Sequence, residues 1–402
     1  MRLLHFSDIH IGMENYGKLD PETGLSTRLV DFFKTFDFIV DTAISENVDA
    51  VIFAGDAYKT RDPNPTQQRG FGERVKRLAK AKIPTVMVVG NHDTPNAEGK
   101  ANTLDIYSAL EIDNVWISRK PELLNIPTKS GNLQVITLPW LHKNDYKTIA
   151  EKLKLLYEKI SAKSPAIFLS HCEVEGASYG SEKGLAIAND VTIPLPILQD
   201  KRLSYVALGH IHKHQVLSNP PTGGPLIVYS GSPQRIDFGE EKEEKGICLV
   251  EILTPTRGVE NKEPRGSAKW VSSFQFIPTN ARKFLTIKVD LAENDSNPNQ
   301  TILDEIAKHS TEDKIVRLII NIPVSCDKEI EMDKIKKALS SAHLVAGITR
   351  NVEKIEREKI DFGREVESLT PVAALRKYFE TKKYPAEKQK EMEQYAAKLL
   401  EN

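Results

Sequence analysis

Short apolar runs alternate with amphipathic stretches over roughly the first 280 residues. The runs are RLLHF, AVIFAGD, TVMVVGNHD, AIFLSH and YVALGHIH, each ending at or just before Gly or a polar residue. Runs this short, rich in Val, Ile, Leu and Phe, predict buried strands. Helical spacing of apolar residues predicts helices over 29–43, 67–82 and 146–160. This alternation predicts an α/β fold in which helices cover sheets.

Two later strands complete this region, and a second unit follows it. One strand begins at Lys245, and 270–277 alternates apolar and polar residues as an edge strand does. The intervening segment 254–267 is rich in Pro, Gly and charge and is expected to be an exposed loop. We therefore assign 1–280 to one domain.

The second unit begins near Lys283 and has its own order of elements. Strand-like FLTIKVDL and KIVRLIINIPV surround a helical segment over 302–308, and a helix over 332–342 and a weaker strand over 345–349 follow. This order predicts a small α+β domain over 281–360.

The C-terminal tail, 361–402, is predicted to hold two short helices. Thr370 is a candidate N-cap followed by Pro371 at the first helical position, and Pro385 opens the second helix. Apolar residues lie on one face of each helix: Val372, Leu375, Phe379, Met392, Tyr395, Ala396, Leu399 and Leu400. These faces can pack on the protein itself or dock on a partner, and we favour a partner.

Composition narrows the classes of protein. A chain of 402 residues predicts two or three domains, and a net charge of -1 provides no global basic field for nucleic acid. Cys172, Cys248 and Cys326 are too far apart for a disulfide framework or a CxxC zinc site, so a reducing compartment is expected. No apolar stretch approaches the ~18 residues of a membrane span, and RLLHF is too short for a signal-peptide core. We expect a cytoplasmic protein with no membrane partner.

Side chains that commonly ligate metals follow all five apolar runs. They are Asp8, His10, Asp56, Asn91, His171, His210 and His212. Strand ends that meet at one sheet edge would bring these side chains together. Two carboxylates, one amide and four imidazoles are too many for a single tetrahedral zinc. They suit two divalent ions about 3.5–4 Å apart that share a carboxylate, and Asp56 is the expected bridge. Mn, Fe, Co and Zn all fit such ligands. The alternative is a chance collection of core histidines and turn aspartates.

Two further residues are candidates for catalysis. His92 follows Asn91 and could protonate a leaving oxygen or stabilise charge, while Asp93 could orient the His92 imidazole. The alternatives are a structural imidazole and a turn-forming aspartate.

Several other residues have competing interpretations. We expect Cys172, beside His171, to point into the core, and His214 to face the surface or the substrate. Arg235, in SGSPQRIDFGEE, either faces a phosphate or belongs to a tight turn. A basic run in the second predicted helix could touch DNA, but such runs are more often solvated faces: Arg69, Arg74, Lys76, Arg77, Lys80 and Lys82.

The five blocks DxH, GD, GNHD, H and GHxH, in this order, resemble the calcineurin-like metallophosphoesterase superfamily over residues 1 to 240. The segments YSGSPQRIDFGEEKEEKG (229–246) and GLSTRLVDFF (24–33) resemble the SbcD-type nuclease subunits. These are bacterial relatives of the archaeal and eukaryotic double-strand-break repair nuclease. The resemblance implies a metallophosphoesterase β-sandwich flanked by helices, a DNA-capping domain at 281–360, and a tail that grips an SbcC-like ATPase.

The resemblance also implies roles for particular residues. One manganese would be held by Asp8, His10, Asp56 and His212, and the other by Asp56, Asn91, His171 and His210. His92 would be the catalytic histidine. Lys59 departs from some relatives: at this position after the GD block, the archaeal and eukaryotic proteins often carry a histidine and other bacterial ones an acid.

The implied function is a two-metal phosphodiesterase that cleaves DNA. It would act as an exonuclease on duplex ends, 3′ to 5′, and as an endonuclease on single-stranded or hairpin DNA. An SbcCD-like complex in DNA repair, recombination and replication would contain it as a homodimer within a heterotetramer. Two alternatives stay open: another metallophosphoesterase, such as a phosphatase or small-substrate phosphodiesterase, and a non-catalytic scaffold.

Overall fold

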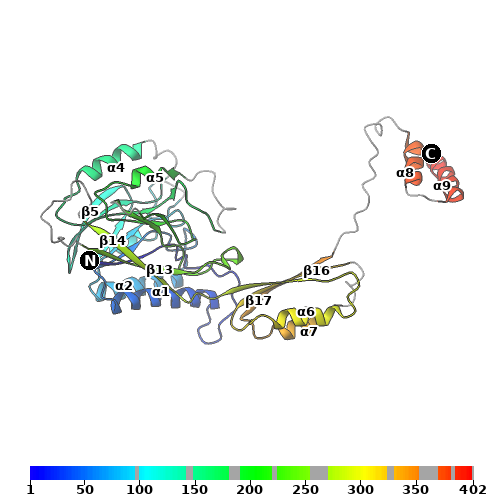
Figure 1. The fold of residues 1–402 in the computed structure, drawn as a ribbon, viewed down its shortest axis with the longest axis horizontal. Coiled ribbons are helices and arrows are strands. Elements are labelled where there is room, and N and C mark those ends of the chain that lie inside the picture. The colour runs from blue at the N-terminus through cyan, green and yellow to red at the C-terminus, as the bar shows by residue number, and fades with distance from the viewer. Residues whose placement is uncertain are drawn as a thin grey trace, which may run out of the picture.

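Two six-stranded sheets face one another in the N-terminal part of the chain (Figure 1). The computed structural model describes residues 1–95, 99–141, 148–180, 191–219, 224–253, 270–323, 330–352, 370–381 and 385–400. The first sheet has the order β14-β13-β1-β2-β3-β4, and the second has the order β11-β12-β10-β7-β6-β5.

The strands of the first sheet are β1 (Arg2–Phe6), β2 (Ala50–Phe53), β3 (Thr85–Val88), β4 (Val115–Ser118), β13 (Gly246–Leu253) and β14 (Val271–Pro278). Those of the second are β5 (Glu122–Thr128), β6 (Gly131–Leu138), β7 (Ala166–His171), β10 (Tyr205–Gly209), β11 (Gln215–Ser218) and β12 (Leu226–Tyr229). The edge strand expected over 270–277 is confirmed as β14, which pairs antiparallel with β13. A minor sheet pairs β8 (Glu173–Val174) with β9 (Thr192–Ile193).

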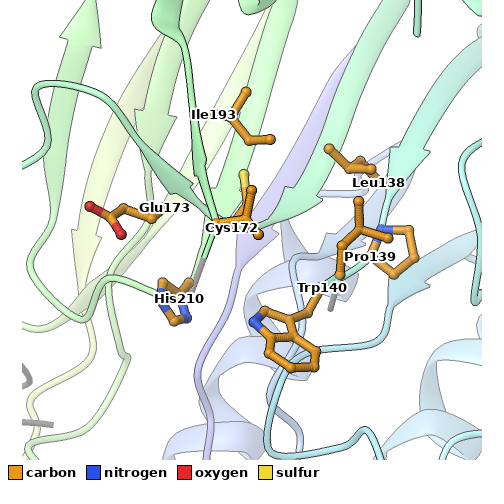
Figure 2. Close-up of a pocket in the computed structure, with 9 residues that line it drawn as sticks. Leu138, Pro139, Trp140, Cys172, Glu173, Ile193 and His210 are labelled. Carbon is orange, nitrogen blue, oxygen red and sulfur yellow. The ribbon is translucent and has the colours of Figure 1, made fainter. Parts of the chain in front are cut away.

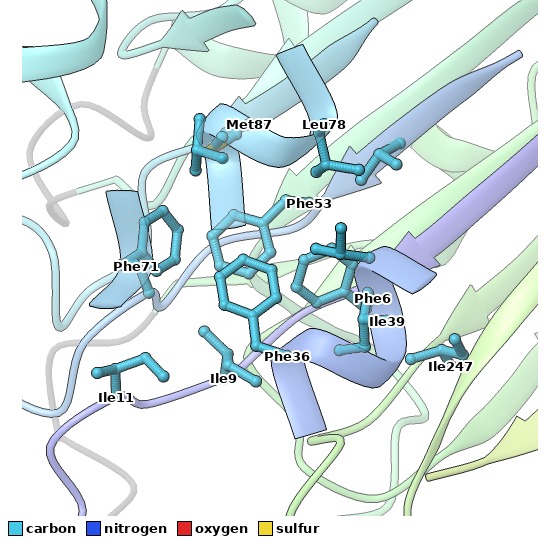
Figure 3. Packing of buried hydrophobic residues seen from close by; sticks show 14 of the residues in the cluster. Phe6, Ile9, Ile11, Phe36, Ile39, Phe53, Phe71, Leu78, Met87 and Ile247 are labelled. Carbon is cyan, nitrogen blue, oxygen red and sulfur yellow. The ribbon is translucent and has the colours of Figure 1, made fainter. Parts of the chain in front are cut away.

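Alternating side chains send each strand's apolar residues into two separate cores. Leu3 packs between the two sheets, whereas Leu4 and Phe6 pack against helices on the outer face of the first sheet. Figure 3 shows Phe6 and Phe53 packed against Phe36 and Phe71 from those helices. The helices are α1 (Thr27–Ser45), α2 (Pro65–Lys80) and α3 (Asp105–Ala109).

The outer face of the second sheet is covered in the same way. Here α4 (Ile149–Glu158) and α5 (Leu195–Leu198) enclose a third core. The layers are therefore helix, sheet, sheet and helix, which confirms the expected α/β sandwich flanked by helices.

Four neighbouring strands of each sheet run parallel to one another. In the first sheet β1, β2, β3 and β4 are parallel, and in the second β6, β7, β10 and β12 are. Carboxyl ends of parallel strands share one sheet edge, which is where α/β proteins assemble their sites.

A separate three-stranded parallel sheet follows, with its own buried core. It contains β15 (Phe284–Asp290), α6 (Pro298–Ala307), β16 (Ile315–Ile322), α7 (Met332–Ala338) and β17 (Leu344–Val352). The predicted order of elements is confirmed. Helix α7 is shorter than expected because the chain turns after Leu339, whose carbonyl accepts from the Ala342 N–H. Strand β17 is longer because its pairing with β16 extends to Val352.

The tail holds the two predicted helices, α8 (Pro371–Thr381) and α9 (Ala386–Leu400), which contact one another. Both start beside the prolines that predicted them. No described helix combines the length and hydropathy that crossing a bilayer requires. Some expectations fall outside the described residues. They are the loop over 254–267, residues 146–147 of the helix predicted over 146–160, the strand end at Val324, Cys326, and tail residues 361–369.

The core between the sheets should dominate stability. Leu133 of β6 is fully buried in that core, so Leu133→Ala should lower the free energy of unfolding by about 2–5 kcal/mol. Urea denaturation measures this change. Leu253→Ala, at the exposed end of β13, is the matched control, and an equal loss in both variants would contradict the assigned layers.

Candidate metal centre

All seven predicted ligands lie at the shared edge of the two sheets. Asp8 and His10 follow β1, Asp56 follows β2 and Asn91 follows β3. His171 ends β7, and His210 and His212 follow β10 in the facing sheet. The site is therefore built from both sheets, three strand ends from one and two from the other.

The backbone turns sharply where these residues leave the strands. Asp8, His10, Asp56 and His210 have φ of 52, 44, 60 and 95°. Non-glycine residues seldom occupy this left-handed region, and they do so mainly where surrounding contacts enforce it at functional sites. Here the N–H of Asp8 donates to the Gly55 carbonyl at 2.9 Å, which ties the first two turns together.

Close approach of these turns requires glycine at several of the motif positions, among them Gly90 and Gly209. A Cβ on Gly90 would lie 2.1 Å from Oδ1 of Asp56, and one on Gly209 would lie 2.1 Å from the Ala54 carbonyl oxygen. Any larger residue would push β3 away from the Asp56 turn, or β10 in the second sheet away from β2 in the first. Glycine is thus needed before Asn91 and before His210 because a side chain at either position would collide with a neighbouring turn or strand.

The ligands form two groups that meet at Asp56. In the first group, Nε2 of His10 lies 3.1 Å from Nε2 of His212 and 4.0 Å from Oδ1 of Asp8. In the second, Oδ1 of Asn91 lies 2.9 Å from Nε2 of His171 and 3.2 Å from Nδ1 of His210.

Asp56 lies between the groups. Its Oδ2 atom is 3.7 Å from Nε2 of His10 and 3.4 Å from Nε2 of His171. Within the described part of the chain, three sets of three side chains place ligand atoms within 4.8 Å of one another, and Asp56 belongs to two of them. One carboxylate oxygen thus faces both groups, as a bridging ligand must.

Partners on the far side of two rings determine which nitrogens face the centre. Nδ1 of His171 is 2.7 Å from the Ala54 carbonyl, and Nδ1 of His212 is 2.8 Å from Oε1 of Glu240. Since these oxygens can only accept, each Nδ1 carries the hydrogen and a neutral ring presents a lone pair at Nε2. These lone pairs point into the cluster, so the donor set fits divalent cations.

Buried charge sets the electrostatics of the centre. Burial alone would raise the pKa of Asp56, but the imidazoles of His171, His92 and His10 hold it well below its usual range. Burial lowers the pKa of His10 and raises that of Asp8. For His171, burial opposes protonation, but the Asp56 carboxylate prevails and raises the pKa to about 9. The centre therefore attracts positive charge.

His92 is half-buried at the margin of the centre, and its orientation differs from expectation. The backbone N–H of His92 donates to Oδ1 of Asp56 at 2.8 Å. Nδ1 of the His92 ring donates to the backbone carbonyl of Lys59 at 2.8 Å. The expected contact between Asp93 and this imidazole is not what the structure shows. The Lys59 carbonyl performs that role, so the side chain at this position is not needed for it.

Asp93 instead fixes the two turns around it. Its fully buried carboxylate accepts from the N–H groups of Asp56, Ala57 and Gly90 at 2.9–3.0 Å. Burial, together with the charge of Asp56, raises the pKa of Asp93 to about 7. Asp93 thus joins the GD turn to the GNHD turn.

Two other candidates, Arg235 and His214, make contacts within the protein. Arg235 is buried and donates to the carbonyls of Ala281 and Glu243, which supports the tight-turn interpretation. His214 was expected to face the surface or the substrate; it is half-buried and stacks on Phe276 with ring centroids 4.3 Å apart.

Cys172 is confirmed as a core residue. It lines a hollow beside His210 and Trp140 (Figure 2), with room for about 10 Å³, roughly one water and not a nucleotide.

Two arginines of the basic run on α2 pair with α1. Arg74 and Arg77 both contact Asp37, and Arg77 also contacts Asp41. These contacts favour a helix–helix role for the two arginines over contact with DNA.

One functional partner was missed from the sequence. Glu240 is fully buried and contacts His212, although it lies 28 residues further along the chain. The signal available was its position within the FGEE segment after the GHIH block, but nothing there distinguishes a metal-ligand partner from a surface acid.

Comparison with known proteins agrees with this geometry. The family model described as calcineurin-like phosphoesterase matches residues 1–214, more than half of the chain. The chain belongs to this family. The candidate metal ligands at the sheet edge are thus found in a member of a metallophosphoesterase family, and the expected fold class is confirmed.

The curated relatives of this chain are nucleases and DNA repair proteins by name. The chain is 30% identical over 259 residues to the DNA double-strand break repair protein Mre11 of Sulfurisphaera tokodaii, covering 62% of this chain and 59% of that protein. It is 27% identical over 271 residues to the SbcD component of nuclease SbcCD from Bacillus subtilis, covering 62% and 66%. With the SbcD component of nuclease SbcCD from Staphylococcus saprophyticus it is 23% identical over 405 residues, covering 90% and 100%. The first two matches span less than two thirds of the relative.

Metal binding should be linked to proton release. Without metal, the His171 imidazole holds its proton up to a pH of about 9, and a ligand nitrogen must give up that proton to bind a cation. The dissociation constant for Mn²⁺ should therefore fall as pH rises from 6 to 9. Calorimetric titration in buffers of different ionisation enthalpy measures both affinity and proton release. Affinity independent of pH would contradict His171 as a ligand.

Proposed function

We propose that this protein is a two-metal phosphodiesterase that cleaves DNA, the SbcD-type subunit of an SbcCD-like repair complex. It would act as an exonuclease on duplex ends and an endonuclease on single-stranded or hairpin DNA. The observation that carries the proposal is the position of Asp56 Oδ2, 3.7 Å from the His10 nitrogen and 3.4 Å from the His171 nitrogen. The names of the curated relatives support DNA as the substrate.

The ligand set proposed from the sequence is retained. Asp8, His10, Asp56 and His212 would hold one ion, and Asp56, Asn91, His171 and His210 the other, with manganese as the expected metal. Bound ions would polarise the phosphate, lower the pKa of the attacking water and neutralise charge that develops at phosphorus.

His92 would supply the proton. Because its Nδ1–H donates to the Lys59 carbonyl, its Nε2 is the atom left to exchange a proton with substrate. The hydrogen bond from the His92 backbone N–H to Asp56 keeps the His92 ring beside the proposed bridging carboxylate. Asp93 is proposed as a positioning residue that holds both turns rather than as an acid or base.

The remaining units are proposed to serve large partners. Helices α6 and α7 lie on the same side of the three-stranded sheet (Figure 1), and polar side chains such as Lys288 and Asn321 line its other face. Such a face suits a capping domain over 281–360 that contacts DNA. In the tail, Met392, Tyr395 and Leu399 are exposed apolar residues that suit docking on an SbcC-like ATPase. The complex would be a heterotetramer containing a homodimer of this chain.

Loss of the bridging carboxylate should abolish cleavage. Asp56→Asn removes the negative charge shared by both groups, so Mn²⁺-dependent cutting of plasmid and end-labelled duplex DNA should fall by at least about 100-fold. A phosphomonoester is assayed in parallel, and Asp41→Asn on the surface of α1 is the control. Brisk phosphomonoester hydrolysis without DNA cutting would replace the nuclease with a phosphatase. If neither is cleaved, the assay is repeated with the ATPase partner and ATP.

Removal of the proposed acid should separate catalysis from metal binding. His92→Ala should lower the cleavage rate by about 10²- to 10⁴-fold, the usual contribution of general acid catalysis. Mn²⁺ affinity, measured by calorimetry, should change little because no ligand is lost. Unchanged cleavage would favour the scaffold or a different acid.

A further inference from the structure

Glu240 connects a predicted metal ligand to the interior. Its Oε1 accepts from Nδ1 of His212 at 2.8 Å, and its Oε2 lies 2.9 Å from Nζ of Lys245 and accepts from the Ile236 N–H at 2.9 Å. The His212 imidazole and the Lys245 ammonium therefore both lie beside this buried carboxylate. The orientation of the His212 ring therefore depends on where Glu240 is held.

Glu240 ends a single helical turn, η3 (Phe238–Glu240), that packs on the three-stranded sheet. The Phe238 ring meets the Phe284 ring of β15 edge to face at 4.9 Å between centroids. The Arg317 guanidinium of β16 lies over the same Phe238 ring at 4.3 Å.

The residue after Glu240 is held by the same sheet. The Glu241 carboxylate accepts from the N–H of Thr286 at 2.9 Å and from its hydroxyl at 2.6 Å. Contacts at Phe238 and Glu241 thus bracket Glu240 and fix η3 to β15. A shift of β15 has to move the backbone that carries Glu240.

A second ligand turn reaches the same place. Tyr16 follows His10 in the loop after β1, and its ring contacts both Phe238, at 5.4 Å, and Phe284, at 5.6 Å. Three rings from three segments therefore meet at one point, which we call the aromatic joint (Tyr16, Phe238 and Phe284). Two of these segments bear on the first ligand group. One carries His10, and the other carries Glu240, the partner of His212.

We propose that Glu240 is a positioning residue for His212, and that the aromatic joint couples the β15–β17 unit to the first ligand group. The proposal rests on the metal centre of the proposed function and extends it to regulation. Outer partners of a ligating histidine fix its tautomer and direction, and their loss typically weakens metal binding 10- to 100-fold. A unit that moves η3 thereby changes one ion's affinity and leaves the ion held by Asn91, His171 and His210 less affected.

The coupling must be reciprocal. If the β15–β17 unit affects the first group, an ion in that group affects the packing of β15 on η3 by the same free energy. Mn²⁺ should therefore slow amide hydrogen exchange in β15 of the wild-type chain. This readout needs no DNA and no catalysis.

The test is Mn²⁺ titration of the full chain by calorimetry. Phe238→Leu removes the ring contacts without touching a buried charge, and it should weaken one of two binding sites by about two- to thirtyfold, the usual range for residues that carry coupling. Glu240→Gln should weaken the same site by about 10- to 100-fold.

Two control variants isolate the joint. Phe238→Tyr keeps the ring and should bind as wild type. Phe33→Leu on α1 removes a ring that also has an arginine over it, Arg74 at 4.6 Å, but it lies outside the joint and should leave both sites unchanged. In the Glu240→Gln background, Phe238→Leu should add little, because both changes act through one path.

Unchanged affinity in Phe238→Leu, or equal weakening of both sites in Phe33→Leu, would overturn the coupling. A wild-type chain that binds no Mn²⁺ would overturn the coupling and the metal centre together. A chain that binds Mn²⁺, responds to these changes and cuts no DNA, either alone or with the ATPase partner and ATP, would support the coupling while rejecting the nuclease.

Discussion

The arrangement of the site depends on keeping the Asp56 carboxylate charged while it is almost fully buried. Burial of an ionised carboxylate is costly unless nearby cations or donors compensate for it. Here compensation comes from His10 and His171 on opposite sides and from the backbone N–H of His92. Each of these donors stands on a different strand end, so folding of both sheets is required before the charge can be accommodated. Formation of the site therefore depends on formation of the fold.

The same requirement explains the tight turns. A carboxylate shared between groups needs β3 to approach the Asp56 turn closely, and Gly90 leaves room for this. Asp93 then ties the two turns together through three backbone donors. The left-handed backbone at Asp8 and Asp56 directs their side chains into the centre, and the surrounding hydrogen bonds enforce it. Against the effect of burial, the Asp56 carboxylate raises the pKa of the neighbouring His171 imidazole.

Most of the fold could be predicted from the sequence because its signals are local. An apolar run such as AIFLSH predicts both a strand and the candidate ligand at its end, and parallel strands bring such ends together. The partners of the ligands could not be predicted in the same way. The orienting group of His92 is a backbone carbonyl, at Lys59, which leaves no trace in residue identity. Glu240 looks like its acidic neighbours until the folded chain buries it, and the stacking of His214 on Phe276 depends on a strand contributed much later in the chain.

The backbone carbonyl of Lys59, and not its side chain, contacts the His92 ring. A role that passes through the Lys59 carbonyl is available to any residue with the same backbone path, so a lysine there leaves the His92 ring held as before. By contrast, Glu240 acts through its side chain, with one oxygen on His212 and the other beside Lys245. Substitution at Glu240 removes a buried charge, while substitution at Lys59 leaves the carbonyl in place. Tolerance to change in this centre should therefore follow which atoms act, backbone or side chain, more closely than distance from the ligands.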